Sequence, residues 1–198
     1  MSDRGMRQTL GQSYVRTFAP DAATRSVDDF YPTPQEMTEA LLSVEKFTGG
    51  IWEPACGDGA MSRVLLAAGY NVFSSDLIDR GYGLGGVDFL KSSRARNFNV
   101  VTNPPYKLIE PFIHRSLENA SRKVALLGRL ALLEGQGRRE TIWNQTPLAR
   151  VWVFSKRIAC VKPGDPEYGT KGGKGGMIAY AWFVWDHEHV GKPTLGWI

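Results

Sequence analysis

The stretch Ile51–Gly59, with the sequence IWEPACGDG, decides the fold that we expect for this chain. It opens with a short run, Ile51–Glu53, which predicts a strand and passes directly into a turn that contains two glycines. Residues 60–68 then predict a helix, which Gly69 ends. A strand, a glycine turn and a helix in this order are typical of open α/β sheets, in which ligands bind beyond the carboxyl ends of the strands.

The segments on both sides of this stretch repeat the alternation of helix and strand. Before it, residues 35–47 carry apolar residues at helical spacing. The elements predicted after it are strands at 70–74 and 97–102, a helix at 107–121 and a strand from 123. This alternation predicts an α/β fold with a doubly wound, mostly parallel sheet.

The last part of the chain departs from this alternation. Residues 149–155 and 178–185 predict two strands with no helix between them, and the connection is rich in glycine. A direct return of this kind predicts an antiparallel pair, which we expect at the edge of the sheet.

The composition fits one globular domain in a reducing compartment. The chain has 198 residues, 42% of them hydrophobic, and two cysteines, which are too few for a disulfide framework. The polar residues 1–27 predict a flexible arm, and residues 28–198 predict the domain itself. We predict no signal peptide and no transmembrane segment, and therefore a cytoplasmic protein. The net charge of +4 permits a polyanionic partner without requiring one.

The glycine turn at Gly57–Gly59 carries acidic residues. Ser62 stands where a dinucleotide-binding turn would have its third glycine, and no Lys-Ser or Lys-Thr pair of a phosphate-binding loop follows. Glu53 and Asp58 would repel a phosphate, but they suit a ligand that carries an ammonium and a sulfonium group. S-adenosylmethionine is such a ligand, and we expect it at this turn.

The predicted strand 70–74 leads to Asp76, which lies 17 residues after the second glycine of the turn. A carboxylate at this place accepts ribose hydroxyls in dinucleotide sites. Leu77 and Ile78 follow it and would pack on an adenine ring. The alternative interpretation is that Asp58 and Asp76 are ordinary loop carboxylates.

The corner Asn103–Tyr106, with the sequence NPPY, follows the predicted strand 97–102 directly. Two consecutive prolines stiffen it, and the side-chain oxygen of Asn103 and the carbonyl of Pro104 would accept two hydrogen bonds from one amino group. An aromatic amine is a weak nucleophile because its lone pair is delocalised, and two such acceptors favour its reactive form. Tyr106 offers a ring on which a planar group would stack. The alternative is a structural proline-rich loop.

These residues resemble the motifs of the N6-adenine DNA methyltransferases, which have the class I, seven-stranded, S-adenosylmethionine-dependent fold. Five motifs stand in the family's order between residues 30 and 106. The resemblance implies a seven-stranded sheet with one antiparallel strand. The cofactor-binding residues that it implies are Tyr31, Pro32, Thr33, Pro34, Glu53, Pro54, Ala55, Cys56, Gly57, Asp58, Gly59, Asp76, Leu77, Ile78, Asp88 and Phe89. The residues implied to be catalytic are Asn103, Pro104, Pro105 and Tyr106.

The resemblance also gives each motif a part in the site. Tyr31–Pro34 and Glu53–Gly59 would bind the methionine end of the cofactor, and Asp76 would bind its ribose. Asp88 would accept a hydrogen bond from the amine of the cofactor's adenine, and Phe89 would pack on the ring of that adenine.

Together the motifs imply transfer of a methyl group from S-adenosylmethionine to the N6 amine of adenine in DNA, with the target base flipped into the site. About 90 residues follow Tyr106, and the fold itself needs most of them, so we expect no separate target-recognition domain. In this respect the chain resembles the small, solitary enzymes of phages and prophages, and we expect it in the cytoplasm of a bacterium or of a phage-infected cell.

Two kinds of alternative function remain. The same corner occurs in enzymes that methylate the glutamine amides of proteins and in some RNA methyltransferases, because these substrates also present a planar amino group. The second kind is a module that binds S-adenosylmethionine without activity and serves a partner subunit.

A basic, glycine-rich segment at 155–176 predicts contacts with nucleic-acid phosphates, although a solvated edge loop is the alternative. Its candidate residues are Lys156, Arg157, Lys171 and Lys174. The sequence His187–His189 lacks a third spaced ligand, so we predict no metal site. We expect Cys56 to be a small packing residue rather than a nucleophile.

Overall fold

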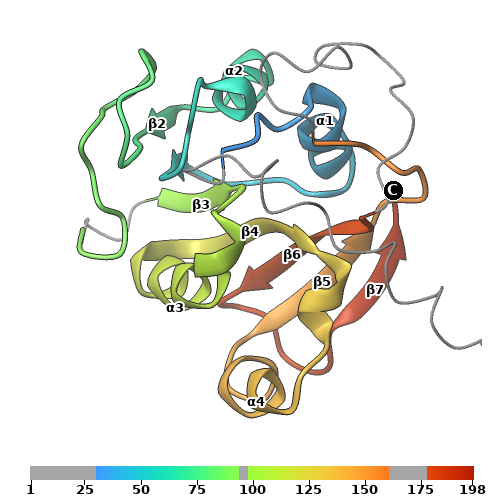
Figure 1. Ribbon diagram of the computed structural model, residues 1–198. Helices are drawn as coiled ribbons and strands as arrows, with labels where there is room; N and C mark the ends of the chain where they lie inside the picture. Colours follow the sequence, from blue (N-terminus) through green and yellow to red (C-terminus); the bar gives the residue numbers. More distant parts are fainter. Residues whose placement is uncertain (1–29, 94–97, 161–177) are drawn as a thin grey trace, which may run out of the picture.

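A single sheet forms the centre of the structure. The computed structural model describes residues 30–93, 98–160 and 178–198. In these segments seven strands pair in the order β2-β1-β3-β4-β6-β5-β7 (Figure 1). The strands are β1 (Gly50–Glu53), β2 (Val72–Ser74), β3 (Phe98–Thr102), β4 (Ala120–Arg129), β5 (Leu148–Val153), β6 (Tyr180–Asp186) and β7 (Thr194–Trp197).

The strand directions confirm the predicted fold class. β1 pairs in parallel with β2 and β3, β3 pairs in parallel with β4, and β5 pairs in parallel with β7. β6 runs antiparallel to its two neighbours, β4 and β5. The described sheet is therefore doubly wound and mostly parallel, with one antiparallel strand.

The predicted place of the antiparallel pair, at the edge of the sheet, is wrong. β7 pairs with the outer side of β5, from Arg150 opposite Thr194 to Val153 opposite Trp197, and so forms the edge. The sequence of β7, TLGW, is short and lacks the alternation of apolar and polar residues that predicts a strand. Backbone hydrogen bonds hold it instead, such as the 2.9 Å bond from the amide of Ile198 to the carbonyl of Val153.

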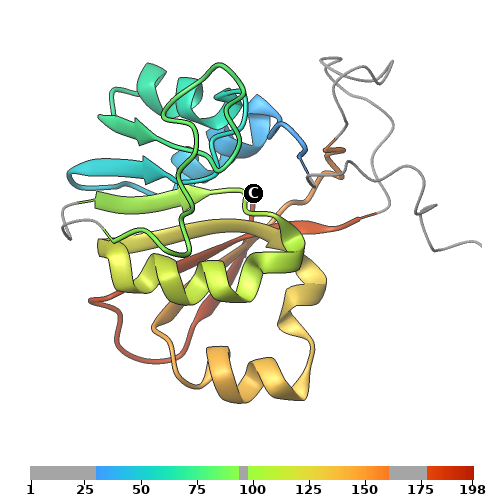
Figure 2. The ribbon, with the colours of Figure 1, turned by 60° about the vertical axis from the view of Figure 1, so that its left-hand side comes forward.

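Helices cover both faces of the sheet, as the two views in Figures 1 and 2 show. α1 (Gln35–Val44) and α2 (Ala60–Ala67) lie on one face, and α3 (Ile109–Asn119) lies on the other. The shorter helical segments are η2 (Tyr106–Leu108), η3 (Leu130–Leu133), α4 (Gln136–Arg138) and the π-helical η4 (Arg139–Trp143). No helix in the described segments has the length and apolar character that a membrane crossing requires.

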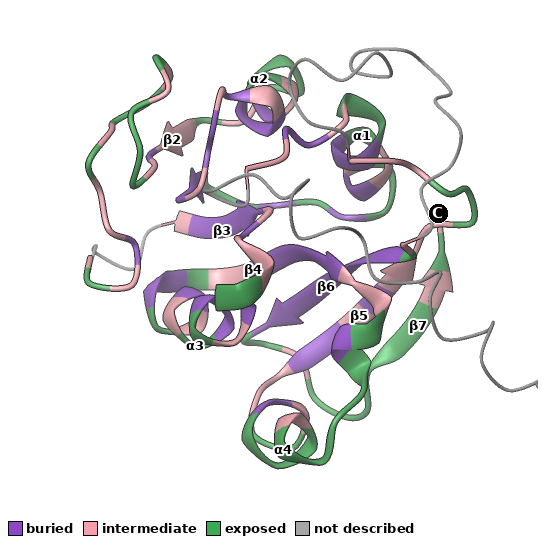
Figure 3. Ribbon diagram, in the orientation of Figure 1, coloured by how far each residue is buried: buried purple, intermediate pink, exposed green. Residues whose placement is uncertain are grey.

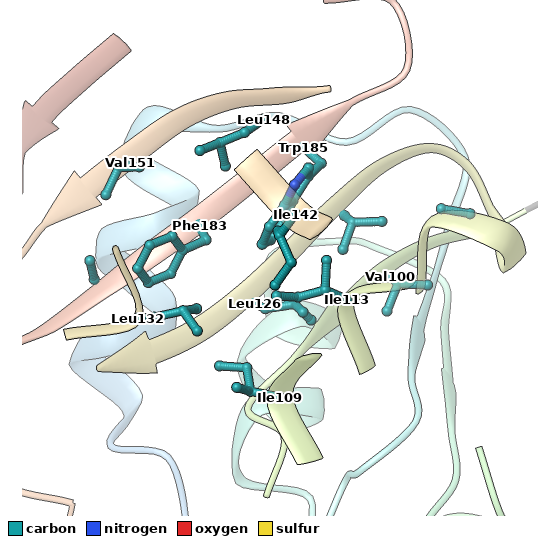
Figure 4. Packing of buried hydrophobic residues seen from close by; sticks show 13 residues of the cluster. Val100, Ile109, Ile113, Leu126, Leu132, Ile142, Leu148, Val151, Phe183 and Trp185 are labelled. Carbon is teal, nitrogen blue, oxygen red and sulfur yellow. The ribbon is translucent and has the colours of Figure 1, made fainter. Parts of the chain in front are cut away.

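Alternate residues of the central strands face the two helical layers. Val100, Val124 and Leu126 belong to the cluster that contains Ile109 and Ile113 of α3 (Figure 4). The cluster beneath α1 and α2 contains Met37, Leu41, Met61, Leu65, Val101, Ala125 and Leu127. All seven residues of β6 are buried, which Figure 3 shows as a continuous purple strand. Because helices cover both faces, these strands are apolar at almost every position rather than at every second one.

Glu45 ends α1 and joins it to the sheet. Its carboxylate, which is 2% exposed, accepts hydrogen bonds from Lys123 Nζ (2.8 Å), from Trp152 Nε1 (3.0 Å) and from the guanidinium of Arg150. Burial acts to raise the pKa of Glu45, but the hydrogen bonds from Arg150, Lys123 and Trp152 outweigh burial and lower this pKa. Since Glu45 is extended, α1 stops at Val44 rather than at residue 47 as predicted.

On the β2 side, the sheet ends beside a loop. Residues 75–90 form no strand, and an isolated bridge joins Ser75, the residue after β2, to Leu84. The amide of Leu84 donates to the carbonyl of Ser74, and the amide of Asp76 donates to the carbonyl of Leu84, both at 3.0 Å. This loop forms one wall of the site described next.

Candidate active site

The strand order reverses next to β1. The chain passes from β1 to β2 on one side and then to β3 on the other, so the carboxyl ends of β1 and β3 meet at a switch point. β1 ends at Glu53 and β3 at Thr102, and the turn 54–59 and the corner 103–106 extend from these ends. An open cavity of about 690 Å³ lies between the turn and the corner.

Residues of all five predicted motifs reach this cavity. The predicted residues that line it are Tyr31, Pro54, Ala55, Asp76, Leu77, Ile78, Asp88, Phe89, Asn103 and Pro105. The predicted residues outside the lining are Pro32, Thr33, Pro34, Glu53, Cys56, Gly57, Asp58, Gly59, Pro104 and Tyr106. The lining residues that we did not predict are Phe30, Arg80, Val87, Leu90, Leu108 and Phe112.

The sequence carries different signals for these missed residues. Phe112 belongs to the apolar face of a predicted helix, which explains it as core, and Leu108 lies within the same predicted helix. Phe30 adjoins the predicted motif Tyr31–Pro34 and would be found by extending that motif by one residue. No pattern points to Arg80, whose guanidinium lies 4.2 Å from the centre of the Phe30 ring.

The two glycines of the turn have no room for a side chain. Gly57 and Gly59 have φ angles of 56° and 84°, in the left-handed region. A Cβ atom on Gly57 would lie 2.3 Å from the ring of Phe30, and one on Gly59 would lie 2.5 Å from the ring of Tyr82. The turn therefore requires glycine both for its backbone conformation and for the aromatic rings packed on it.

The carboxylate of Asp76 fastens the glycine turn to the loop after β2. Its Oδ2 accepts a hydrogen bond from the amide of Gly57 (2.8 Å), and its Oδ1 accepts one from the amide of Ile78 (2.9 Å). Each carboxylate oxygen has a further lone pair, so Asp76 retains the capacity to accept hydrogen bonds from the cavity that it lines. Leu77, 61% exposed, and Ile78, 36% exposed, present apolar side chains beside it.

Glu53 lies beneath the turn rather than in the cavity lining. It is 2% exposed and accepts a hydrogen bond from the hydroxyl of Ser62, which also lies 2.6 Å from the hydroxyl of Ser74. Burial raises the pKa of Glu53 to about 8, because the charged form loses its hydration. The structure therefore places this carboxyl in a buried network that joins β1, α2 and β2.

Asp58 and Cys56 shape the turn from within. Asp58 Oδ1 accepts a 3.1 Å hydrogen bond from the amide of Ala60, at the start of α2. Cys56 is 4% exposed, and its thiol lies 3.5 Å from the carbonyl oxygen of Tyr82. Burial raises the pKa of Cys56 to about 12, which keeps the thiol protonated and fits the packing role predicted for it.

Asp88 and Phe89 stand at the opposite wall of the cavity. A hydrogen bond from Lys91 Nζ, 3.0 Å from Asp88 Oδ2, lowers the pKa of Asp88 and keeps this residue ionised. The ring of Phe89 is only 3% exposed and lies 5.0 Å from the rings of both Trp52 and Phe112. The Phe89 ring therefore belongs mainly to an aromatic cluster and presents only a small part of its surface to the cavity.

The corner after β3 holds an oriented amide. Asn103 Nδ2 donates a 3.1 Å hydrogen bond to the hydroxyl oxygen of Thr33. Asn103 Oδ1 is buried and has no hydrogen-bond partner among the described residues. The carbonyl of Pro105 accepts a hydrogen bond from the amide of Leu108 (2.8 Å), whereas no backbone amide of the described segments donates to the carbonyl of Pro104. Asn103 Oδ1, on a residue that lines the cavity, is therefore an acceptor that the corner offers to a ligand.

Tyr106 lies between two residues of the neighbouring strands. The guanidinium of Arg129 lies over its ring, 4.7 Å from the centroid, and the ring of Tyr180 lies 5.9 Å away at an angle of 34°. Burial raises the pKa of Tyr106 well above its ordinary value, so the phenol is neutral.

The predicted nucleic-acid contacts are only partly within the described residues. Lys156 and Arg157 are exposed and line a second cavity of about 470 Å³, which Tyr180 also lines. Both residues follow β5, which runs parallel to β4 and β3. They therefore lie beyond the carboxyl ends of these strands, as the corner 103–106 does. Lys171, Lys174 and the predicted arm 1–27 lie outside the described residues.

Comparison with known proteins places this site on a familiar fold. No protein-family model matches the sequence, and no curated protein matches it. The modification subunit assigned to a type I restriction enzyme of Vibrio vulnificus has a similar structure, with a TM-score of 0.58 and 12% identity over 83% of this chain. A protein of Pyrococcus horikoshii assigned as an RNA methyltransferase has a TM-score of 0.57 and 15% identity over 80% of this chain and 87% of its own.

The magnesium protoporphyrin IX methyltransferase of Synechocystis, solved with bound S-adenosylmethionine, has a TM-score of 0.51 and 13% identity, over 77% of this chain and 78% of its own. This chain spans 45% of the Vibrio protein. At such low identities the similarity establishes the arrangement of helices and strands. The chain therefore has the class I fold that these methyltransferases share.

Proposed function

We propose that this protein transfers a methyl group from S-adenosylmethionine to the N6 amine of adenine in DNA. The observation that carries the proposal is the orientation of Asn103. Its amide nitrogen is occupied by Thr33, while its side-chain oxygen is buried, has no partner among the described residues, and belongs to a residue that lines the cavity. An acceptor held in this way suits the N–H of a planar amine.

The residues of the cavity suit S-adenosylmethionine. Asp76 would accept hydrogen bonds from the ribose hydroxyls, and Leu77 and Ile78 would pack against the adenine. The contact with Lys91 keeps Asp88 ionised, and Asp88 would accept a hydrogen bond from the amine of the cofactor's adenine. When bound, the cofactor supplies a methyl group that is already activated by a positively charged sulfur.

The corner would hold and activate the target nitrogen. Asn103 Oδ1 and the carbonyl of Pro104 would accept its two N–H bonds, which favours the pyramidal form and stabilises the positive charge that develops on nitrogen. The nitrogen would bond to the methyl carbon as the carbon–sulfur bond breaks with its electrons on sulfur, and the nitrogen would then lose one proton to solvent. Fixing the nitrogen in line with the methyl group contributes several kcal/mol, about 7 or more in well-oriented systems.

Tyr106 would receive the base. An adenine in a duplex has to leave the stack, which costs a few kcal/mol, roughly what is recovered when a base stacks on an aromatic ring. We include in the proposal that residues 28–198 act as the catalytic domain.

The proposal is tested by offering three substrates to the purified protein with a methyl-labelled cofactor. The substrates are an adenine-containing DNA, an RNA of the same sequence and a glutamine-containing release factor. We expect label in DNA, and N6-methyladenine in its hydrolysate by mass spectrometry. Label only in RNA or only in protein would move the activity to that substrate, and cofactor binding without any transfer would indicate an inactive module.

The Asn103→Ala variant connects the activity to the corner. We expect its turnover to fall by about 100-fold or more, because an acceptor for the developing charge is lost, while cofactor affinity stays within a few-fold of wild type. Asn144→Ala, at an exposed position outside the site, is the matched control and should retain full turnover. Full activity in Asn103→Ala would contradict the assigned role of the corner.

A further inference from the structure

Arg129 stands at the carboxyl end of β4, next to the strand that carries the NPPY corner. β3 pairs with β4 up to Thr102 opposite Leu126, so Arg129 extends three residues beyond that pair, alongside the corner. It also pairs with Tyr180 across β4 and β6. Both Arg129 and Tyr180 contact the ring of Tyr106, and the guanidinium covers it at 4.7 Å from the centroid.

The charge of Arg129 has no acidic partner among the described residues. Four other partly buried arginines of the described segments each contact a carboxylate, namely Arg115, Arg122, Arg138 and Arg150. For Arg129, the described residues provide no ion pair, and its Nε is buried without a hydrogen-bond partner. A half-buried guanidinium in this state is unfavourable unless an anion completes it.

The charges on the two sides of the corner are of opposite sign. The cavity on one side is lined by two carboxylates, those of Asp76 and Asp88, against one guanidinium, that of Arg80. On the other side, Arg129 pairs with Tyr180, and Tyr180 lines the second cavity together with the exposed Lys156 and Arg157. The acidic side suits a cationic cofactor, and the basic side suits a polyanion that passes the corner.

We propose that Arg129 binds a backbone phosphate of the nucleotide whose base enters the Asn103–Tyr106 corner. A guanidinium matches a phosphate with two parallel N–H···O hydrogen bonds, which a lysine cannot make. On binding, it leaves the Tyr106 ring face that it covers in this structure, and the base takes its place. This inference rests on the proposed function and narrows its substrate class to a nucleic-acid strand, because a glutamine side chain of a protein offers no phosphate.

The salt dependence of strand binding tests this contact. Binding of a fluorescent, single-stranded, adenine-containing DNA oligonucleotide is followed by anisotropy over a series of NaCl concentrations, with S-adenosylhomocysteine present. For Arg129→Gln we expect the slope of log K against log salt to become shallower by about 0.7, the value for one lost phosphate contact on a single strand. Affinity at low salt should fall about tenfold or more. Arg129→Lys should keep the wild-type slope but not the full affinity.

Arg115→Gln is the matched control, because Arg115 is also half-buried but pairs with Glu118 on α3. It should bind the oligonucleotide as wild type does. Far-UV circular dichroism of each variant establishes that it is folded. A wild-type slope and affinity in folded Arg129→Gln would overturn the proposal, as would a wild-type protein that does not bind the strand at low salt.

The outcomes separate this inference from the proposed function. A shallower slope in Arg129→Gln supports the phosphate contact even if the wild-type protein methylates no adenine, in which case only the proposed reaction fails. If the wild-type protein methylates DNA and Arg129→Gln binds as wild type, only this inference fails. A loss of S-adenosylhomocysteine affinity with an unchanged slope would place the guanidinium at the cofactor's carboxylate and reject the proposal.

Discussion

Asn103 and Thr33 lie 70 positions apart in the sequence, and a 3.1 Å hydrogen bond from the Asn103 amide to the Thr33 hydroxyl oxygen joins them at the cavity. Because an amide has a donor end and an acceptor end, occupying the nitrogen decides which end faces the ligand. Thr33 is 7% exposed and is not part of the cavity lining, so it acts through Asn103. The segment before α1 and the end of β3 therefore contribute to one functional group.

Replacing Thr33 by valine should lower turnover about 10- to 100-fold, because the Asn103 amide loses the partner that orients it. Affinity for the methyl donor should change little, since the side chain of Thr33 does not line the cavity. Thr33→Ser keeps the hydroxyl and should restore most of the turnover. Steady-state kinetics on an adenine-containing DNA, together with calorimetric titration of the donor, measure both quantities. Equal turnover in the valine and serine variants would show that the hydroxyl does not position Asn103.

Replacing Gly57 by alanine should impair both stability and donor binding. A left-handed φ costs an alanine about 1–2 kcal/mol, and its Cβ would meet the Phe30 ring at 2.3 Å. Gly69→Ala is the control, because Gly69 also has a positive φ, 89°, but nothing lies within 4 Å of its Cβ position. Urea unfolding should show a larger loss for Gly57→Ala, which adds the clash with Phe30 to the strained φ, and only Gly57→Ala should lose donor affinity, by about tenfold or more. An equal loss of donor affinity in both variants would contradict the role given to the contact between Gly57 and Phe30.

The buried carboxylate of Glu45 predicts how stability depends on acid. Its pKa is lowered in the folded protein from an ordinary value of 4.5, so the stability that it contributes is complete above that pH and is lost as the pH falls through the folded pKa. Glu45→Gln should lower the free energy of unfolding at pH 7 by about 3 kcal/mol, because Lys123 and Arg150 lose their buried partner. The difference from wild type should shrink as the pH falls below the ordinary value of 4.5.

Chemical denaturation at pH 7 and at pH 3.5 measures this difference. Glu118→Gln is the control, because Glu118 pairs with Arg115 on the surface of α3 with its side chain 61% exposed. The cost of that substitution should stay below about 1 kcal/mol. A constant difference between Glu45→Gln and wild type over this pH range would reject the role of ionisation.

Glu53 should have the opposite effect on the pH dependence of stability. Burial raises its pKa from 4.5 to about 8, so between these values the unfolded chain releases the proton while the folded chain retains it. Stability should therefore fall as the pH rises from about 4.5 to 8, and Glu53→Gln should remove this part of the fall. Thermal unfolding at several pH values between 5 and 8.5 measures the slope. Glu36→Gln, at an exposed position of α1, should leave the slope of wild type.

The sequence predicts the central sheet well because its strands and helices are delimited by local signals. Pro34 precedes α1, glycines bound the turn before α2, and apolar runs mark β3 and β6. These signals depend on residues that are close in the sequence, so they can be interpreted without knowledge of the fold.

The features that the sequence does not predict depend on contacts between distant segments. β7 is held by hydrogen bonds to β5 and not by apolar periodicity. The ring of Phe30 packs on Gly57, and Arg129 covers the ring of Tyr106. The distance in sequence between the members of each pair gives no sign that they are in contact. The motif residues predict where the site lies, whereas the orientation of Asn103 and the positive charge beside Tyr106 emerge only from the tertiary structure.

The two walls of the site, the corner 103–106 and the loop after β2, differ in how well they tolerate amino-acid substitutions. The corner 103–106 is continuous with β3, whose residues pack between two layers of helices, so the core fixes the backbone from which the corner extends. On the opposite wall, residues 76–90, Asp76 is bonded to the glycine turn and Phe89 packs in the aromatic cluster, whereas the side chains of Leu77 and Leu84 are exposed. Mutations at Leu77, which is exposed and lines the cavity, can adjust how tightly the small ligand is held without weakening the scaffold. Selection can therefore alter affinity for the ligand independently of the chemistry at the other wall.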